Sequence, residues 1–317
     1  MLRLQQMILR GEWRMKYVLL LVLASFFWAG NFVIGKELTA YASPGALTLL
    51  RYALAVLVLL PLVWWKERQL LPPKAAFLPL FLMGVTGVVL FNLLQFLALA
   101  NTTASNVGVI STLNTYSIAI CAVLLLKERI TLIQAGAMII SFAGACLVIT
   151  SGSGGGMQGV QSGDLWMLAA VGVFGIYSVC SRWATSYVSP MMSVLYSGII
   201  GVGILLPVEG PSFAIHGADS YFVGAVLYIS LIATILCMVF WGTGVKYLGA
   251  LTAGLFMNLN PVFTVILAFI LLGEQPALLQ LGGTAIVIAG CLLYSYASMQ
   301  KKPVTVPVPS SKQPAAE

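Results

Sequence analysis

The chain of 317 residues is 60% hydrophobic and only 8% charged, and its mean hydropathy is +1.00. A soluble domain has about 25% charged residues, so this composition excludes a soluble enzyme, a nucleic-acid-binding protein and a disordered scaffold. Membrane β-barrel strands alternate apolar and polar residues, and the long apolar runs of this chain do not. The net charge of +7 is carried largely by short segments between these runs. We therefore expect an all-α polytopic membrane protein.

A helix needs about 20 apolar residues to cross the hydrocarbon core of a bilayer. Cutting the sequence at charges, prolines and Gly/Ser clusters predicts ten transmembrane helices, at 17–35, 44–65, 76–99, 105–126, 131–150, 164–184, 190–208, 220–241, 248–272 and 277–298. A basic segment, 1–16, precedes them, and a tail rich in Pro, Ser and Lys, 299–317, is predicted to be disordered. We interpret the first span as an uncleaved anchor; alternatively, Met15 is the true start of the chain.

The distribution of Lys and Arg predicts the orientation, because cytoplasmic loops carry the excess of positive residues. With the N-terminus in the cytoplasm, fourteen basic residues lie on the inner side and only Lys36 lies on the outer side. The remaining one, Arg51, is expected near the outer end of the second span. We therefore predict a multi-pass protein of the inner (plasma) membrane with both termini in the cytoplasm.

The two halves of the sequence align without a gap at an offset of 146 residues. Pairs of scarce residue types coincide at this offset: Ser43-Pro44 with Ser189-Pro190, Leu60-Pro61 with Leu206-Pro207, Asn114 with Asn260, Glu128 with Glu274, and Gln134 with Gln280. The chain is therefore predicted to contain two repeats, 17–150 and 164–298, joined by a Gly/Ser-rich external linker, 151–163. Because each repeat has five spans, the second must be inverted relative to the first, as in many secondary transporters.

Several motifs resemble a known family. Trp28-Ala29-Gly30-Asn31 followed by Lys36, Arg51 in the second span, and the Glu128…Gln134 and Glu274…Gln280 pairs resemble the EamA domains of the drug/metabolite transporter superfamily, in its ten-span bacterial exporter type. The resemblance implies a transporter of amino acids, other metabolites, nucleotide-sugar-like compounds or drugs. The second repeat departs from the pattern of the first span, since Phe174, Ile176 and Tyr177 replace Trp28, Gly30 and Asn31.

Polar and aromatic side chains near the middle of the spans are candidates for a substrate pathway, because polar groups are costly there. The candidates are Trp28, Asn31, Asn92, Gln95, Asn114, Tyr116, Tyr177, Trp241, Asn258 and Asn260. The alternative is that each makes a hydrogen bond between packed helices. Asn260-Pro261 further predicts a break in the ninth span, since proline removes a backbone donor.

Five charged residues are candidates for gating or for electrostatic attraction of a substrate: Lys36, Arg51, Arg182, Glu128 and Glu274. The cations could attract a carboxylate, or they could simply extend to the membrane interface. The two glutamates are expected to accept hydrogen bonds from the N-terminus of the following helix, or alternatively to act as gates. No carboxylate falls in the middle of a predicted span, so we expect transport without a carboxylate proton relay.

Together these features predict an integral inner-membrane transporter that exports small polar or amphipathic, amino-acid-like metabolites by alternating access. The alternatives are a lipid-carrier flippase of the same fold, or a drug efflux or uptake permease. An intramembrane enzyme would need a converged nucleophile and base, which the sequence does not offer. We expect a metabolite and the bilayer as partners, no nucleic acid, a monomer or homodimer, and no cofactor or metal.

Overall fold

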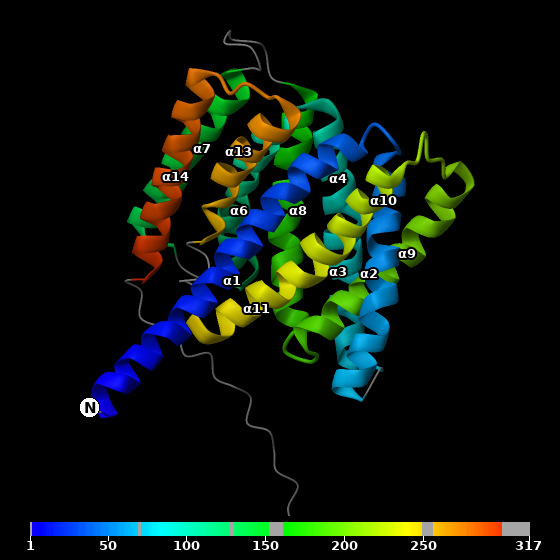
Figure 1. Cartoon of the computed structure of the whole chain (residues 1–317), viewed down its shortest axis with the longest axis horizontal. Helices are drawn as coiled ribbons and strands as arrows, with labels where there is room; N and C mark the ends of the chain where they lie inside the picture. Colours follow the sequence, from blue (N-terminus) through cyan, green and yellow to red (C-terminus); the bar gives the residue numbers. More distant parts are fainter. Residues whose placement is uncertain (1, 69–70, 127–129, 152–160, 249–255, 300–317) are drawn as a thin grey trace, which may run out of the picture.

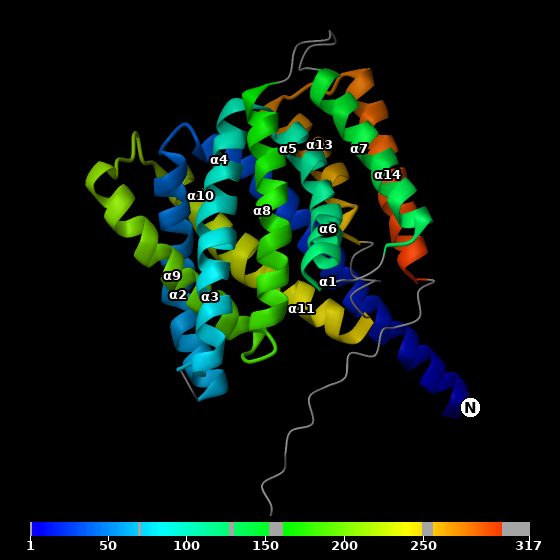
Figure 2. The ribbon, with the colours of Figure 1, turned by 180° about the vertical axis from the view of Figure 1, so that it is seen from behind.

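The computed structural model is a bundle of helices, shown from two opposite sides in Figures 1 and 2. The structure describes residues 2–68, 71–126, 130–151, 161–248 and 256–299. Glu128, most of the predicted linker and nearly all of the predicted tail lie outside these residues.

The described helices have the length and composition of membrane spans. Eight helical segments in this part of the chain are long and apolar enough to cross a bilayer, and two apolar helices, Asn260–Leu272 and Leu278–Tyr294, are shorter. The predicted all-helical architecture is confirmed, whereas the number of ten spans stays a prediction.

The described residues up to Leu126 form nine helical elements: α1 (Leu2–Leu38), α2 (Pro44–Glu67), η1 (Lys74–Ala76), α3 (Phe77–Met83), η2 (Gly84–Leu90), α4 (Phe91–Asn101), α5 (Ala104–Ile110), η3 (Ser111–Leu113) and α6 (Asn114–Leu126). The remaining elements are α7 (Leu132–Ser151), α8 (Ser162–Ala184), α9 (Pro190–Glu209), η4 (Gly210–Ser212), α10 (Ser220–Leu227), η5 (Tyr228–Leu236), α11 (Cys237–Leu248), α13 (Asn260–Leu272) and α14 (Leu278–Met299). The basic N-terminal residues from Leu2 onward continue the first span as one unbroken helix.

Corresponding helices of the two repeats begin with the same local chemistry. The Ser43 hydroxyl accepts a hydrogen bond from the backbone of Ala46 at the start of α2, and the Ser189 hydroxyl accepts one from Met192 at the start of α9, both at 3.1 Å. Each serine is followed by a proline, whose fixed φ and missing N–H suit the first helical turn. The offset of 146 residues seen in the sequence is thus also an offset between equivalent helix starts.

Two spans contain a π-helical segment, and these segments lie at corresponding places in the two repeats. They are η2 between α3 and α4, and η5 between α10 and α11. A π-helix is rare and is frequently found at functional sites. Nothing in the sequence analysis predicted these two segments.

Two other spans are interrupted before an asparagine. The predicted break at Asn260-Pro261 is confirmed, because α13 begins at Asn260 after a turn. The corresponding span of the first repeat is interrupted by the 3₁₀ segment η3, and α6 begins at Asn114. This second break has no proline to signal it.

Helices that correspond in the two repeats pack against each other. α7 lies beside α14 at one side of the bundle and α2 lies beside α9 at the other, with α1, α8, α6 and α13 between the two pairs (Figures 1 and 2). The Ser43 hydroxyl donates to Glu209 at 3.1 Å, and the Ser189 hydroxyl donates to Glu67. α2 and α9 are therefore antiparallel, with the start of each beside the end of the other.

The bundle is apolar outside and carries polar groups inside. Leu124, Ile139 and Ile270 leave 65–71% of their surface exposed, whereas Asn92, Gln95 and other polar side chains are buried. Large exposed apolar areas of this kind suit contact with lipid rather than with water.

The backbones of α7 and α14 approach each other closely. A Cβ atom added at Gly144 would lie 2.8 Å from the backbone carbonyl oxygen of Gly283 and 2.8 Å from the backbone nitrogen of Val287. Gly136, two turns earlier on α7, has open space at the same position. Small residues allow helices to approach closely in membranes, where packing rather than hydrophobicity drives association.

We therefore predict that Gly144→Val lowers the free energy of unfolding by roughly 1–3 kcal/mol, because the added side chain must push α7 and α14 apart. Gly136→Val is the matched control on the same helix, and its effect should stay within about 0.5 kcal/mol. Thermal unfolding of both variants in detergent measures the difference. Equal melting temperatures for the two variants would contradict the helix contact.

Candidate functional site

Arg51 is buried inside the bundle, with 7% of its surface exposed. It is the eighth residue of α2, so it lies about 10 Å along the helix from the Ser43 end. Its place near the outer end of the second span stays a prediction, but the alternative that its side chain extends to the membrane interface is wrong. The reason is that its side chain turns inward, toward polar groups of neighbouring helices.

Both hydrogen bonds of the Arg51 guanidinium go to neutral oxygens. Its Nε donates to the Thr234 hydroxyl at 2.8 Å, and its Nη1 donates to Asn92 Oδ1 at 3.1 Å. The guanidinium also lies 5.8 Å from the centre of the Tyr52 ring. Among the described residues, no carboxylate bonds to this buried cation.

The two partners of Arg51 belong to the two π-helical regions. Thr234 lies in η5, where its hydroxyl also donates to the carbonyl of Ile229, five residues earlier, at 2.8 Å. Asn92 follows η2 and donates to the carbonyl of Gly87, also five residues earlier, at 2.7 Å. Arg51 therefore joins one side chain from each repeat at the point where the helical hydrogen bonding is irregular.

Four predicted pathway residues carry a buried polar atom without a hydrogen-bond partner among the described residues. These atoms are Oδ1 of Asn31, Nε2 of Gln95, Oδ1 of Asn114 and Nδ2 of Asn258. A buried donor or acceptor left unpaired costs about 1–3 kcal/mol. Four of them in one bundle indicate a region where water or a ligand completes the hydrogen bonding.

Helix contacts place these amides at similar depths. Gly35 of α1 faces Leu99 of α4, and the two helices run in the same direction in Figure 1. Asn31 and Gln95 each lie four residues before that contact, about 6 Å along their helices. The two unpaired amides of α1 and α4 thus occur at one level of the bundle.

A second contact aligns the two interrupted spans. Gly108 of α5 faces Thr264 of α13. Asn114 lies six residues after this contact and Asn260 four residues before it, so both occur roughly 6–9 Å from it along their helices. Asn260 itself is satisfied, because its Oδ1 accepts from Thr264 at 3.3 Å. The unpaired groups are therefore those of Asn114 and of Asn258 in the adjacent turn.

The aromatic candidates divide into two groups. Trp28 and Trp241 lie together, with ring centres 5.7 Å apart, and the Trp28 indole donates to the carbonyl of Ala233 in η5 at 3.0 Å. Tyr177 lies over Gly87 of η2, where a Cβ would approach the tyrosine ring to 2.1 Å. These three side chains border the π-helical segments.

Tyr116 belongs to a different contact. Its hydroxyl shares a hydrogen bond with Ser141 at 2.5 Å and donates to the Cys291 sulfur at 3.2 Å. These partners lie on α7 and α14, so the contacts of Tyr116 match the packing alternative rather than the pathway.

Two of the charged residues at helix ends, Lys36 and Glu274, lie near enough to interact electrostatically. Lys36 is half-buried near the end of α1, and Arg182 is exposed near the end of α8. Glu274 accepts from the backbone N–H groups of Ala104 at 2.8 Å and Ser105 at 3.1 Å, and from the Ser105 hydroxyl at 2.6 Å.

Glu274 accepts hydrogen bonds from the N-terminus of a helix, as predicted, but this helix is not the one that was predicted. It caps α5 of the first repeat and not the following helix α14, because Gly273, at φ +66°, ends α13 and turns the chain aside. Glu128, its counterpart in the first repeat, lies outside the described residues.

A buried polar network near the start of α8 was missed in the sequence. Asp164 accepts from the Thr102 hydroxyl at 2.7 Å and from Asn106 Nδ2 at 3.1 Å, and Gln280 donates to Asn106 Oδ1 at 2.8 Å. The network connects the α4–α5 turn, α8 and α14 at one end of the bundle. The spacing of Gln161 and Asp164, a capping box in the structure, was the available signal.

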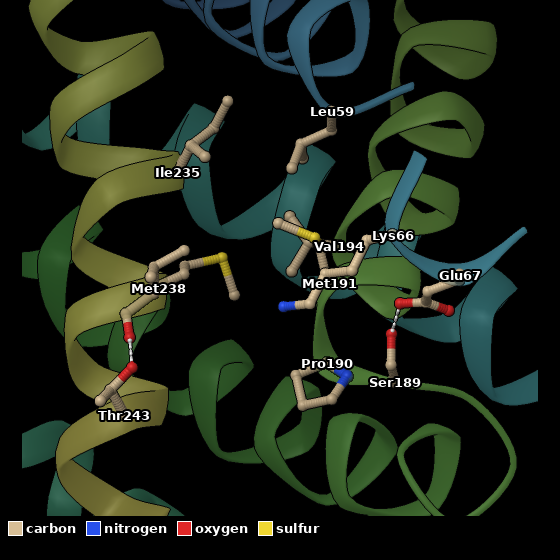
Figure 3. Close-up of a pocket in the computed structure, with 11 residues that line it drawn as sticks. Leu59, Lys66, Glu67, Ser189, Pro190, Met191, Val194, Ile235, Met238 and Thr243 are labelled. Carbon is tan, nitrogen blue, oxygen red and sulfur yellow. Dashed lines mark hydrogen bonds between the residues drawn. The ribbon is translucent and has the colours of Figure 1, made fainter. Parts of the chain in front are cut away.

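A cavity of about 480 Å³ lies near the opposite end, between α2, α9 and the η5–α11 region (Figure 3). Its walls are largely apolar, with Leu59, Met191, Val194, Ile235 and Met238 among them. None of the ten predicted pathway residues lines it. Ile235 in its wall directly follows Thr234, a hydrogen-bond partner of Arg51.

Comparison with known proteins agrees with this architecture. The EamA-like transporter family matches residues 15–150 and 161–296, and both bounds of the second match are displaced by 146 residues. A solved crystal structure aligns with 90% of this chain and 98% of its own, with a TM-score of 0.60 and 18% sequence identity, which is a likeness of fold.

Three relatives cover most of the chain. The uncharacterized transporter YyaM of Bacillus subtilis is 29% identical over 88% of this chain and 93% of its own. An uncharacterized transporter of Archaeoglobus fulgidus is 28% identical over 87% and 96%. The S-adenosylmethionine/S-adenosylhomocysteine transporter of Chlamydia muridarum is 23% identical over 87% and 88%. With two matches that together span most of its length, the chain belongs to the EamA-like transporter family.

Proposed function

We propose that this protein is a ten-span transporter of the inner membrane that moves a small polar or amphipathic metabolite by alternating access. Its two EamA repeats are inverted relative to each other, and both termini lie in the cytoplasm. The antiparallel packing of α2 and α9, which correspond in the two repeats, supports this inversion. Export is the proposed direction, following the ten-span exporter type that the sequence resembles.

The observation that carries the proposal is the set of unpaired amide atoms on Asn31, Gln95, Asn114 and Asn258. In lipid, unsatisfied polar groups cost several kcal/mol each, so groups of this kind belong at a cavity that a polar solute or water occupies. Two of the four lie next to interrupted helices, where transporter substrate sites are usually found.

The two ends of the bundle differ in a way that supports alternating access. The Asp164–Asn106–Gln280 network ties three helices together at one end. The cavity between α2, α9 and α11 lies near the other end. In the proposed orientation, the end that contains the Asp164–Asn106–Gln280 network is external and the cavity is cytoplasmic. The structure then corresponds to an inward-facing state.

We predict that Asn114→Leu reduces transport at least tenfold without loss of folded protein, because a substrate amide partner is replaced by an apolar side chain. Asn101→Ala is the matched control, since Asn101 is exposed and bonds only to the carbonyl of Leu97 within its own helix. The measurement compares extracellular and intracellular metabolites of cells that overexpress each form. A wild-type protein that changes no compound in either pool would contradict the proposed function.

The inverted repeat makes a separate prediction for equivalent positions. Ala40 and Ser186 are both exposed turn residues, and they are 146 residues apart. In a variant without the five native cysteines, Ala40→Cys should react with a membrane-impermeant maleimide in intact cells. Ser186→Cys should react only after the membrane is permeabilised. Labelling of both positions from the same side would contradict the inversion.

A further inference from the structure

We propose that the substrate carries an anionic group, such as a carboxylate, and that Arg51 is its counter-ion in the transport site. This inference rests on the proposed function and adds the chemical class of the substrate. It is argued from the hydrogen bonding of Arg51 and from the position of a second cation, Lys66, in the cavity.

The first argument is the missing counter-charge. A charged side chain inside a bilayer is costly, and such residues usually pair with one another. Arg51 has two neutral partners, Thr234 and Asn92, and the described carboxylates lie at helix ends away from it. A guanidinium has five N–H donors, and these two hydrogen bonds occupy only two of them. The remaining donors match the paired oxygens of a carboxylate.

A second cation, Lys66, lies on the same helix as Arg51, in the wall of the cavity. Figure 3 shows the amine of Lys66 pointing into the cavity, whose wall includes Leu59, two turns from Arg51 on α2. The only acidic residue in that wall, Glu67, accepts a hydrogen bond from Ser189. α2 therefore carries two cations, Lys66 in the cavity wall and Arg51 inside the bundle.

The third argument is the place of Arg51 between the repeats. Thr234 lies in η5, and Asn92 follows η2 and bonds to the Gly87 carbonyl within it. An anion that binds the remaining donors of the guanidinium would lie beside its contacts with Asn92 and Thr234. Binding would therefore affect the contacts that join the two repeats. If the anion binds more tightly in one packing of the halves than in the other, binding favours that packing.

The test compares wild type, Arg51→Gln, Arg51→Lys, Lys66→Gln and Lys74→Gln. Untargeted metabolomics of cells and medium first identifies the compounds whose distribution depends on the wild-type protein. Each variant is then purified, and its melting temperature and its counterflow of the identified compound in proteoliposomes are measured. Lys74 is the matched control, because it is an exposed cation that does not line the cavity.

We expect each identified compound to carry a carboxylate or another anionic group. Arg51→Gln should lower its counterflow at least tenfold, and Arg51→Lys should retain more activity than Arg51→Gln because it keeps the charge. Lys66→Gln should raise the half-saturating concentration severalfold with little change in the maximal rate. Lys74→Gln should match wild type.

One further variant distinguishes a binding role of Arg51 from a purely structural one. Asn92→Asp places a carboxylate against the guanidinium, where the wild-type oxygen lies at 3.1 Å. The substitution also removes the amide donor to the Gly87 carbonyl, so Asn92→Ala, which removes the same donor without adding a charge, is its control. If Arg51 only joins the helices, Asn92→Asp should transport at least as well as Asn92→Ala. If Arg51 binds the substrate, the internal carboxylate competes with it, and the counterflow of Asn92→Asp should fall at least tenfold below that of Asn92→Ala.

The outcomes separate the two proposals. If wild type changes no compound, the proposed function fails. If it moves a compound that has no anionic group, or if folded Arg51→Gln moves the compound at the wild-type rate, the inference about Arg51 is overturned and the transporter remains. If Arg51→Gln does not fold, the inference is tested with Lys66→Gln and Asn92→Asp. Wild-type kinetics in both of these variants would overturn it.

Discussion

A guanidinium buried in an apolar bundle needs a partner for its charge, and the proposed site depends on what supplies that partner for Arg51. Arg51 is held by a threonine and an asparagine, both neutral. Neutral oxygens satisfy hydrogen bonds without removing the charge. Near this cation lie the irregular helical segments η2 and η5, with the Trp28–Trp241 pair at their border. In the proposed mechanism, a transported anion supplies the missing charge.

Duplication allows this site to be built from two halves. Arg51 and Asn92 come from the first repeat and Thr234 from the second, so neither repeat contains the complete set of contacts. The two repeats also share a contact at a helix end, where Glu274 of the second repeat caps α5 of the first. Contacts of this kind change together when the halves move, which is what alternating access between two inverted repeats requires.

The sequence predicted the features that depend on composition and local chemistry. Low charge and long apolar runs indicated membrane helices, Asn260-Pro261 indicated a broken span, and the offset of 146 residues indicated the repeat that the family match confirms. The unpaired amides were all among the predicted candidates, because polar residues in the middle of an apolar span are recognisable without coordinates.

Features that depend on packing between distant segments could not be predicted. Nothing in the apolar run from Gly84 to Leu90 signals the π-helix that the structure has there. The burial of the Arg51 side chain could not be predicted, because a position along α2 does not fix which way a long side chain turns. Glu274 was assigned to the nearest helix in sequence, whereas its partners lie 169 and 170 residues away.

The most direct measurement is a structure of the protein in a lipid nanodisc with its transported compound bound. The account predicts an anionic group of that compound within hydrogen-bond distance of the Arg51 guanidinium, with at least one of the amides Asn31, Gln95, Asn114 or Asn258 also in contact. A bound substrate that leaves Arg51 with only Thr234 and Asn92 as partners would contradict it.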